Sequence, residues 1–515
     1  MRARLEAGLL VLAMTACNST PPGVADETEP RALAAPAVAA SAPEPEHAQC
    51  ASMRRIEAAD VVRVEGDRVF FLNEYRGVTV FDVADVDHPR PIGHSAIMGT
   101  PVALFVRGDD AIAVLTDWEG SAFGGSFRGS VVRAVEARRA GVLATKSEIA
   151  LPGVVRDAAM IDDVLFLLRE RRGPRGEETV VQSLRLVGGA LRTRGEIVLP
   201  GANGAFTVDA TRIVIARRLP APATESEMTI LDVGADPSSP LSIVGSVRVP
   251  GLVPYDARFA IAALDELVYV VACSEAACGA SEPYVLSVVD TRDPEQPRAV
   301  GRLRIPALGG WLVTAFDADR VYVAGDRGYA RATGPTDVHV VDLSDATRPV
   351  LAGTIAVPGS VSSIVPVGDH ALAMGAIGSI DRRMHVVVHD IDVGLPARPR
   401  LTGSAAFGED VTWSLALDQR AAVGVDDTMR FAALPFSTWD EASKRYANGV
   451  QLLRRTPRGL ALAGSATTSG WVERVLFVGG RMVAVSDDGL TVASIDGAFG
   501  PKVVWPPGPS DVLRP

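Results

Sequence analysis

Three carboxylates lie close together in the stretch FDVADVDHPRPIG, residues 81–93: Asp82, Asp85 and Asp87. Carboxylate oxygens are the ligands that calcium prefers in proteins, so this spacing could form a calcium loop. The stretch also holds two prolines and a closing glycine. Proline fixes φ and ends hydrogen-bonded pairing, and aspartate can accept hydrogen bonds from the backbone that follows it. The same residues would therefore also suit a turn.

The stretch recurs along the chain, and the recurrence helps to separate these alternatives. Related copies are LDVGADPSSPLSIVG (231–245), VDTRDPEQPRAVG (289–301), VDLSDATRPVLAG (341–353) and IDVGLPARPRLTG (391–403). Their opening aspartates, at 232, 290, 342 and 392, are 58, 52 and 50 residues apart. The later copies do not all keep a carboxylate at each of the three positions, as a metal loop would require. We therefore predict a repeated turn and no metal site.

Other residues capable of chemistry are scattered. His385 and His389 lie four apart in MHVVVHD, which on a strand separates them by roughly 13 Å, too far for one metal ion. We expect both to be ordinary strand residues. The sequence contains no Gly-x-Ser-x-Gly elbow, no phosphate-binding Walker loop and no His-Glu-x-x-His. No catalytic residue and no cofactor are therefore predicted.

The elements that carry these residues are short runs rich in Val, Ile and Leu, separated by Gly, Pro and Asp, which indicates an all-β chain. A second marker has the same period: LPG (151–153 and 199–201), VPG (249–251 and 357–359) and IPA (305–307). Each repeat of about 50 residues holds four predicted strands, as a propeller blade does. We predict a single large β-propeller of four-stranded blades over residues 55–510, with seven to nine blades and a bare count of nine.

Several segments resemble a known family of secreted bacterial proteins, whose C-terminal β-propeller is distantly related to WD-repeat propellers. The resemblance is carried by EAADVVRVEGDRVFFLN (57–73), GTPVALFVRGDDAIAVLTD (99–117), VVDLSDATRPVLAGTIAVPG (340–359) and WVERVLFVGGRMVAVSDDGLTVASID (471–496). The turns are also similar to LVIVD-type repeats. The resemblance implies a propeller and an exported location, but no activity. Repeats two, three and eight depart from the turn pattern, so the pattern does not define the blade boundaries there.

The N-terminus indicates export. MRARLEAGLLVLAMTAC has two arginines, a short apolar run and small residues before Cys17, and this run is too short to span a membrane. Its end resembles a bacterial lipoprotein cleavage box, which implies a signal peptide of residues 1–17 with Cys17 lipidated, and Asn18 implies sorting to the outer membrane. A plain secretory signal, giving a periplasmic or secreted protein, is the alternative. Residues 18–54 are rich in Pro, Ala and Glu, and we expect a disordered tether.

Three further cysteines are Cys50, Cys273 and Cys278. In an oxidising compartment Cys273 and Cys278 could pair across the loop CSEAAC. Pairing with Cys50 is also possible, and the spacing alone leaves both open.

The net charge of the chain and the residues at its loops restrict the kind of partner that we expect. A net charge of −11 argues against nucleic-acid binding. The longest predicted loops gather on one face of the ring, where strand entries bring Tyr255, Trp311, Trp413 and Trp471. These rings could anchor a partner protein or glycan, or could pack between blades. We expect a non-enzymatic, lipid-anchored binding scaffold of the cell envelope. The alternative is a propeller hydrolase or lyase with its active site at the channel mouth.

Overall fold

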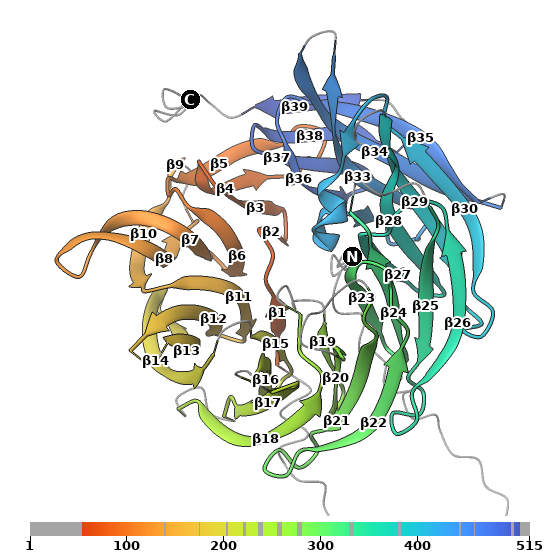
Figure 1. Cartoon of the computed structure of the whole chain (residues 1–515). Helices are drawn as coiled ribbons and strands as arrows, with labels where there is room; N and C mark the ends of the chain where they lie inside the picture. Colours follow the sequence, from red (N-terminus) through yellow and green to blue (C-terminus); the bar gives the residue numbers. More distant parts are fainter. Residues whose placement is uncertain are drawn as a thin grey trace, which may run out of the picture.

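Nine antiparallel β-sheets are arranged in a ring around a central axis (Figure 1). The computed structural model describes residues 54–504 except for 139–140, 175, 202–203, 220–222, 235–239, 255–259, 275–280, 329–333, 380–382, 442–443, 458 and 496–498. The predicted all-β propeller of four-stranded blades is confirmed, and the count of nine blades is correct. The predicted signal peptide lies outside the described residues, as does the predicted tether apart from Arg54.

Each blade is a run of four strands that pair in chain order, from the axis outward. The first blade contains β2 (Val62–Glu65), β3 (Arg68–Asn73), β4 (Gly77–Asp82) and β5 (Arg90–Ser95). The second contains β6 (Thr100–Arg107), β7 (Asp110–Ala122), β8 (Gly125–Glu136) and β10 (Ala144–Leu151). The third contains β11 (Val154–Ile161), β12 (Val164–Gly173), β13 (Gly176–Val187) and β14 (Ala190–Pro200). The fourth contains β15 (Ala205–Val208), β16 (Arg212–Arg218), β17 (Glu225–Asp232) and β18 (Ser242–Pro250).

The later blades follow the same order, and only the eighth has a broken inner strand. The fifth contains β19 (Ile261–Leu264), β20 (Leu267–Cys273), β21 (Tyr284–Asp290) and β22 (Arg298–Ile305). The sixth contains β23 (Trp311–Asp317), β24 (Arg320–Asp326), β25 (Thr336–Asp342) and β26 (Val350–Val357). The seventh contains β27 (Ser363–Val367), β28 (His370–Ser379), β29 (Arg383–Asp392) and β30 (Arg400–Phe407). The eighth contains β31 (Thr412–Trp413), η2 (Leu415–Leu417), η3 (Arg420–Ala422), β32 (Gly424–Val425), β33 (Phe431–Asp440), β34 (Arg445–Thr456) and β35 (Gly459–Thr468). The ninth contains β36 (Val472–Val478), β37 (Arg481–Ser486), β38 (Gly489–Ser494) and β39 (Phe499–Val504).

The recurring aspartate–proline stretch is a turn between the third and fourth strands, as predicted. In the first blade Asp82 Oδ1 accepts a hydrogen bond from Ala84 N at 3.0 Å, and Asp85 Oδ1 accepts one from Asp87 N at 3.1 Å. The same bonds recur in the sixth blade, where Asp342 accepts from Ser344 N and Asp345 accepts from Thr347 N.

The carboxylates of the first turn bind separate partners. Asp82 binds Arg90 at 2.6 Å, Asp85 binds His88 at 2.9 Å, and Asp87 binds Arg481 of the ninth blade at 2.7 Å. Across the described residues, no group of three or more His, Cys, Asp or Glu side chains is placed to hold a metal ion.

The glycine that closes the turn motif lies where the turn of the next blade packs closely against it. A Cβ on Gly301 would clash with the carbonyl oxygen of Ala346, in the corresponding turn of the next blade. A Cβ on Gly245 or Gly353 would clash in the same way with Pro294 O or Pro396 O. The aspartate and proline therefore shape the turn. The glycine, which has no Cβ, leaves room for the turn of the following blade to pack against it.

The Pro-Gly marker ends the fourth strand and begins the connection to the next blade. Gly153, Gly201, Gly251 and Gly359 have φ between 82° and 95°, a conformation that glycine adopts without strain. Their carbonyl oxygens accept hydrogen bonds from hydroxyls of the third strand: Ser130, Thr179, Ser226 and Thr336. This bond fixes the outer edge of a blade to its own third strand.

The three repeats that depart from the turn motif have different third-to-fourth connections. In the second blade the connection contains β9 (Gly141–Val142), which pairs in parallel with β5 of the first blade. In the third and eighth blades the strands meet in tight turns, with Val187 paired to Ala190 and Thr456 paired to Gly459. These connections are too short for the aspartate–proline sequence.

A further strand, β1 (Ile56–Ala58), lies inside the ring and pairs with β11, the inner strand of the third blade (Figure 1). Glu57 at its centre binds Arg107 at 2.7 Å. Arg63 of the first blade donates to the carbonyl oxygens of Ala58 and Leu104. The N-terminal segment is therefore fixed to the walls of the first three blades.

The ring closes by side-chain packing between the first and ninth blades. Among the described strands, those of the ninth blade pair only with one another. One hydrophobic cluster joins Phe71 and Phe81 to Val483 and Leu490, and Arg481 bonds both oxygens of Asp87 at 2.7 and 3.0 Å. No helix in the described part of the chain has the length and apolar character needed to cross a bilayer.

The histidines of the seventh blade have structural roles. His389 is fully buried; its Nδ1 lies 2.7 Å from Ser404 Oγ and its Nε2 lies 2.9 Å from Pro358 O. A carbonyl can only accept, so Nε2 carries the proton and Nδ1 accepts from the hydroxyl. His385 Nδ1 bonds Gly408 O at 2.8 Å.

Burial lowers the pKa of His389 to about 4, against about 6.5 in an unfolded chain. Between these values the unfolded chain binds a proton that the folded chain excludes, so stability falls as the pH falls. We expect this residue to contribute a loss of about 2 kcal/mol between pH 7 and pH 5. His389→Gln should flatten the pH dependence of the free energy of unfolding, measured by urea unfolding. An unchanged slope in His389→Gln would contradict the assignment.

Candidate functional site

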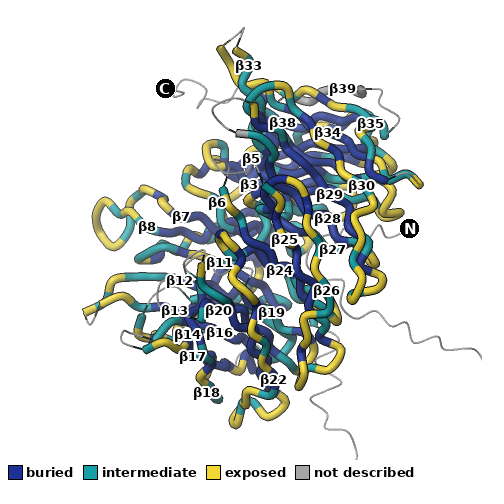
Figure 2. The backbone as a smooth tube through the Cα atoms, turned by 45° about the vertical axis from the view of Figure 1, so that its right-hand side comes forward, coloured by how far each residue is buried: buried dark blue, intermediate teal, exposed yellow. Residues whose placement is uncertain are grey.

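The two faces of the ring differ in their connections. Strands alternate in direction within a blade, so the connections fall on two faces of the ring. One face carries the connections between second and third strands, such as 74–76 and 123–124. The same face carries the connections from one blade to the next, such as 96–99 and 306–310. We call this the loop face. The opposite, turn face carries the first-to-second turns (such as 318–319) and the third-to-fourth turns (such as 343–349). Three long hairpins extend toward the loop face, β7–β8, β12–β13 and β33–β34, and the tips of β7–β8 and β33–β34 project as exposed segments in Figure 2.

Exposed aromatic side chains occur only on the loop face of the described chain. They are Tyr75, Phe123, Trp311 and Tyr446. Phe123, 73% exposed at the tip of β7–β8, packs edge-on against Phe127 with ring centroids 5.2 Å apart. Tyr446 packs edge-on against Trp439 across the β33–β34 hairpin at 5.1 Å. Each hairpin therefore holds its exposed ring in a fixed position.

The four aromatics predicted from the sequence have different environments. Trp311, at the start of β23, is 71% exposed on the loop face. Trp413 and Trp471 are half-buried and lie against each other, with centroids 4.9 Å apart and planes inclined by 32°. Tyr255 lies outside the described residues. Phe123, Tyr75 and Tyr446 were missed; the double glycine between the phenylalanines of AFGGSF could have indicated an aromatic hairpin tip.

The predicted disulfide is only partly described. Cys273, at the buried end of β20, is disulfide-bonded. The other three cysteines of the chain lie outside the described residues, so pairing with Cys278 stays a prediction.

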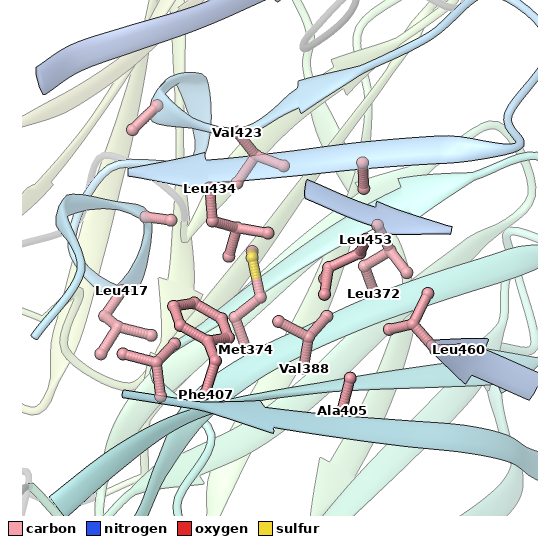
Figure 3. Close-up of a cluster of buried hydrophobic side chains, with 14 of the residues drawn as sticks. Leu372, Met374, Val388, Ala405, Phe407, Leu417, Val423, Leu434, Leu453 and Leu460 are labelled. Carbon is pink, nitrogen blue, oxygen red and sulfur yellow. The ribbon is translucent and has the colours of Figure 1, made fainter. Parts of the chain in front are cut away.

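The eighth blade sends a segment toward the axis in place of a continuous inner strand. β31 and β32 pair with opposite ends of β33. Residues 414–423, which we call the plug, form η2 and η3 between them. Ser414 Oγ donates to Pro435 O and accepts from Ala416 N at 3.2 Å. Leu417 and Val423 insert among Met374, Phe407 and Leu434 of the core between blades seven and eight (Figure 3).

The polar residues of the plug contact other blades near the axis. Gln419 Oε1 accepts a hydrogen bond from Arg474 of the ninth blade at 3.1 Å, and the same arginine binds Asp60 at 2.7 Å. Asp60 lies in the segment between β1 and β2, so the plug, the last blade and the N-terminal segment are joined. Burial raises the pKa of Glu473, the residue before Arg474. The positive charge of Arg474 opposes this increase, and the negative charges of Asp487 and Glu74 add to it.

A small pocket lies between the plug and the inner strands of blades six and seven. It has a volume of about 50 Å³ and is lined by residues that include Leu312, Thr314, Ser363, Asp418 and Arg420. Leu312 directly follows the exposed Trp311 in β23, but Trp311 is not among the residues that line the pocket. Burial lowers the pKa of Arg420 to about 9, which leaves it charged at neutral pH.

The inner strands offer few groups for acid–base catalysis. Histidine and cysteine are absent from the inner strands of the described chain, which are β2, β6, β11, β15, β19, β23, β27, β31, β32 and β36. The six described histidines all lie outside the inner strands. Near the axis, the side chains of the described residues instead supply a cation, hydroxyls and carboxylates, which suit binding by charge and hydrogen bonds.

Comparison with known proteins agrees with the fold. A family model for the Beta propeller domain matches residues 321–497, from β24 of the sixth blade into the ninth blade. This part of the chain resembles that family. A search of curated proteins found no match.

Among solved structures, Sqt1 from Chaetomium thermophilum is similar with 13% identity and a TM-score of 0.41, over 75% of this chain and 91% of that chain. Sqt1 from Saccharomyces cerevisiae has 10% identity and a TM-score of 0.41, over 81% of this chain and 98% of that chain. At these values neither structure bears on function.

Proposed function

We propose that this protein is a non-enzymatic binding scaffold of the cell envelope, which holds a partner protein on its loop face. The observation that carries the proposal is that, among the described residues, the exposed aromatic rings all lie on that face. Aromatic side chains bury a large area at a small entropic cost and are enriched among the residues that dominate interface energies. Two of the rings, Phe123 and Tyr446, are held by a second aromatic, which reduces the cost of ordering them on binding.

The N-terminal segment approaches from the other side of the ring. Arg54 donates hydrogen bonds of 2.8 Å to Ala210 O and Gly234 O, both in connections of the turn face. Arg55 N donates to Asp162 Oδ1 in another such turn. An anchor that precedes these residues therefore leaves the loop face free for a partner.

The aromatic rings can be tested by capture of a partner from envelope extract on the immobilised full-length chain. We expect Phe123→Ala/Trp311→Ala/Tyr446→Ala to reduce retention at least tenfold, since each anchor commonly contributes 1 kcal/mol or more, and a tenfold change is about 1.4 kcal/mol. The matched control is Val142→Ala/Leu395→Ala/Met429→Ala, which removes exposed apolar side chains from the turn face. Equal retention by both triple variants would contradict the proposed face, and retention of a glycan alone would change the class of partner.

The anchor is a separate part of the proposal. We expect Cys17 to carry acyl chains that hold the protein at the outer membrane of a bacterial envelope, because the sequence before Cys17 resembles a lipoprotein signal. Cys17→Ser should then abolish labelling by a fatty acid and move the protein from the membrane fraction to the soluble fraction. If Cys17→Ser stays in the membrane fraction, the protein is attached in some other way.

A further inference from the structure

The β7–β8 hairpin extends beyond the neighbouring blades in both Figure 1 and Figure 2, and its two faces differ in chemistry. From Trp118 to Gly129 its two strands pair residue by residue. Side chains alternate between the faces of a strand, so one face of this part is polar and the other is apolar. The polar face carries Glu119, Ser121, Ser126 and Arg128, and the apolar face carries Trp118, Gly120, Ala122, Gly125, Phe127 and Gly129.

A bulge turns the apolar face toward the first blade. The pairing of β7 with β8 shifts register between Leu115 and Trp118, so these two residues, although three apart, lie on the same side of the sheet. Both belong to the core between blades one and two together with Ile97 of the first blade, and Phe127 packs against this core. Met98, the residue after Ile97, is exposed. The apolar face therefore begins at the core and continues outward along the hairpin.

The aromatic rings form a row along the apolar face. A Cβ on Gly120 would clash with the ring of Trp118, and a Cβ on Gly129 would clash with the ring of Phe127, so each ring occupies the space beside a glycine. The centroids of these two rings are 6.1 Å apart, and the ring of Phe123 follows at 5.2 Å from that of Phe127. The row ends at the tip with a ring that no other blade covers.

Phe123 has a backbone conformation that phenylalanine seldom adopts. Ala122 pairs with Gly125 across a loop of two residues, in which φ is 53° at Phe123 and 84° at Gly124. Turns with positive φ at both positions favour Asn-Gly or Asp-Gly, and a positive φ strains a residue with a large side chain. In the described part of the chain, Phe123 is the only aromatic residue with a positive φ. Neither the turn nor the core requires a ring here, so the ring is suited to a contact outside the chain.

The charges around the apolar face are mainly negative. The projecting part of the hairpin has Asp117, Glu119 and a single cation, Arg128, whose side-chain nitrogens lie 3.9 Å from Asp117 and 3.7 Å from Glu119. On the first blade Glu74 is also exposed, and its backbone oxygen accepts a hydrogen bond from Gly99 N in the connection to the second blade. These carboxylates favour a partner with basic groups and disfavour an anionic bilayer.

We propose that the apolar face of the β7–β8 hairpin packs against an amphipathic segment of the partner protein that is flanked by lysine or arginine, with Phe123 inserted among the apolar side chains of that segment. A two-stranded ribbon is marginally stable alone and gains stability when another element packs on its apolar face. This inference rests on the proposed function, because it names the chemistry of the partner that the loop face holds.

The test is calorimetric titration of the full-length chain with defined probes. The first probe is a short amphipathic helical peptide of leucine and lysine, and the second is the same peptide with glutamate in place of each lysine. We expect saturable binding of the lysine peptide and at least tenfold weaker binding of the glutamate peptide. The third probe is vesicles of phosphatidylcholine and phosphatidylglycerol, which should not bind. Vesicle binding that depends on Phe123 would overturn the proposal and identify a membrane as the occupant.

Phe123→Asn separates binding from folding, because it removes the ring and also relieves the strain of the turn. We expect it to weaken binding of the lysine peptide at least tenfold, while the urea midpoint stays at the parent value or rises. The matched control is Met429→Asn, which replaces another exposed apolar residue of positive φ, 55°, on the turn face; it should leave the affinity unchanged. Equal affinity of Phe123→Asn and the parent, equal binding of the two peptides, or absence of saturation would overturn the proposal.

This inference and the proposed function can fail separately. Phe123→Asn is added to the capture from envelope extract beside the two triple variants. If the loop-face triple variant loses the partner and Phe123→Asn retains it, the loop face binds the partner without the hairpin, and only this inference fails. If both triple variants retain the partner equally, the proposed function itself fails.

Discussion

Asp390→Ala should lower the free energy of unfolding by about 3 kcal/mol, the low end of the range for breaking a buried ion pair. Asp390 in β29 is 1% exposed and accepts two hydrogen bonds from Arg455 of the next blade, at 2.9 and 3.0 Å, and one from His370 at 2.9 Å. Removal of the carboxylate leaves the guanidinium without its partner between blades seven and eight. The loss should be near the low end because Arg455 is partly exposed and can regain water.

A nearby surface pair provides the control. Arg400 binds Asp392 at 2.7 Å, but its side chain is largely exposed. Arg400→Ala should therefore cost less than about 1 kcal/mol. The double variant Asp390→Leu/Arg455→Met should recover part of the loss, because no uncompensated charge remains. Equal denaturant midpoints for Asp390→Ala and Arg400→Ala would show that the buried pair does not join the two blades.

Much of the fold could be predicted from the sequence because each blade repeats local chemistry. The aspartate that opens a turn and the Pro-Gly that ends a fourth strand act on their own neighbours, so their period of about 50 residues indicated the blade. The contacts between distant segments left no such pattern. β1 pairs with β11 about 100 residues away, and β9 pairs with the preceding blade. Strands of two or three residues are too short to show an alternating pattern.

The candidate site was less predictable for a related reason. The sequence gives the type of residue at Trp311, Trp413 and Trp471 but not what covers each ring. The structure leaves Trp311 exposed and places the other two against each other across adjacent blades. The plug has neither a helical nor a strand period, because two short 3-10 turns replace an inner strand. Arg420 therefore gave no signal before the structure placed it near the axis.

Gly301→Ala should destabilise the protein by about 3 kcal/mol, at the upper end of the cost of an added methyl group in a packed site. Gly301 pairs with Val288 beside a bulge in the fifth blade, and an added Cβ would clash with Ala346 O and approach Pro349 Cδ to 3.1 Å. The obstacle is mainly backbone, which cannot rotate away as a side chain can. Relief of the clash would require the turn of the sixth blade to move.

A glycine without neighbours separates this packing effect from the general effect of replacing glycine. Gly125 begins β8 at the tip of a hairpin, and a Cβ there would meet no atom within 4 Å. Gly125→Ala should change stability by no more than about 0.5 kcal/mol. If Gly301→Ala unfolds at the same denaturant concentration as Gly125→Ala, the blades do not approach as closely as the structure shows. If only Gly301→Ala is destabilised, contact between blades requires the closing glycine of the motif. The same substitution at Gly245 or Gly353 should then have a similar effect, because a turn of the next blade packs against each of these glycines.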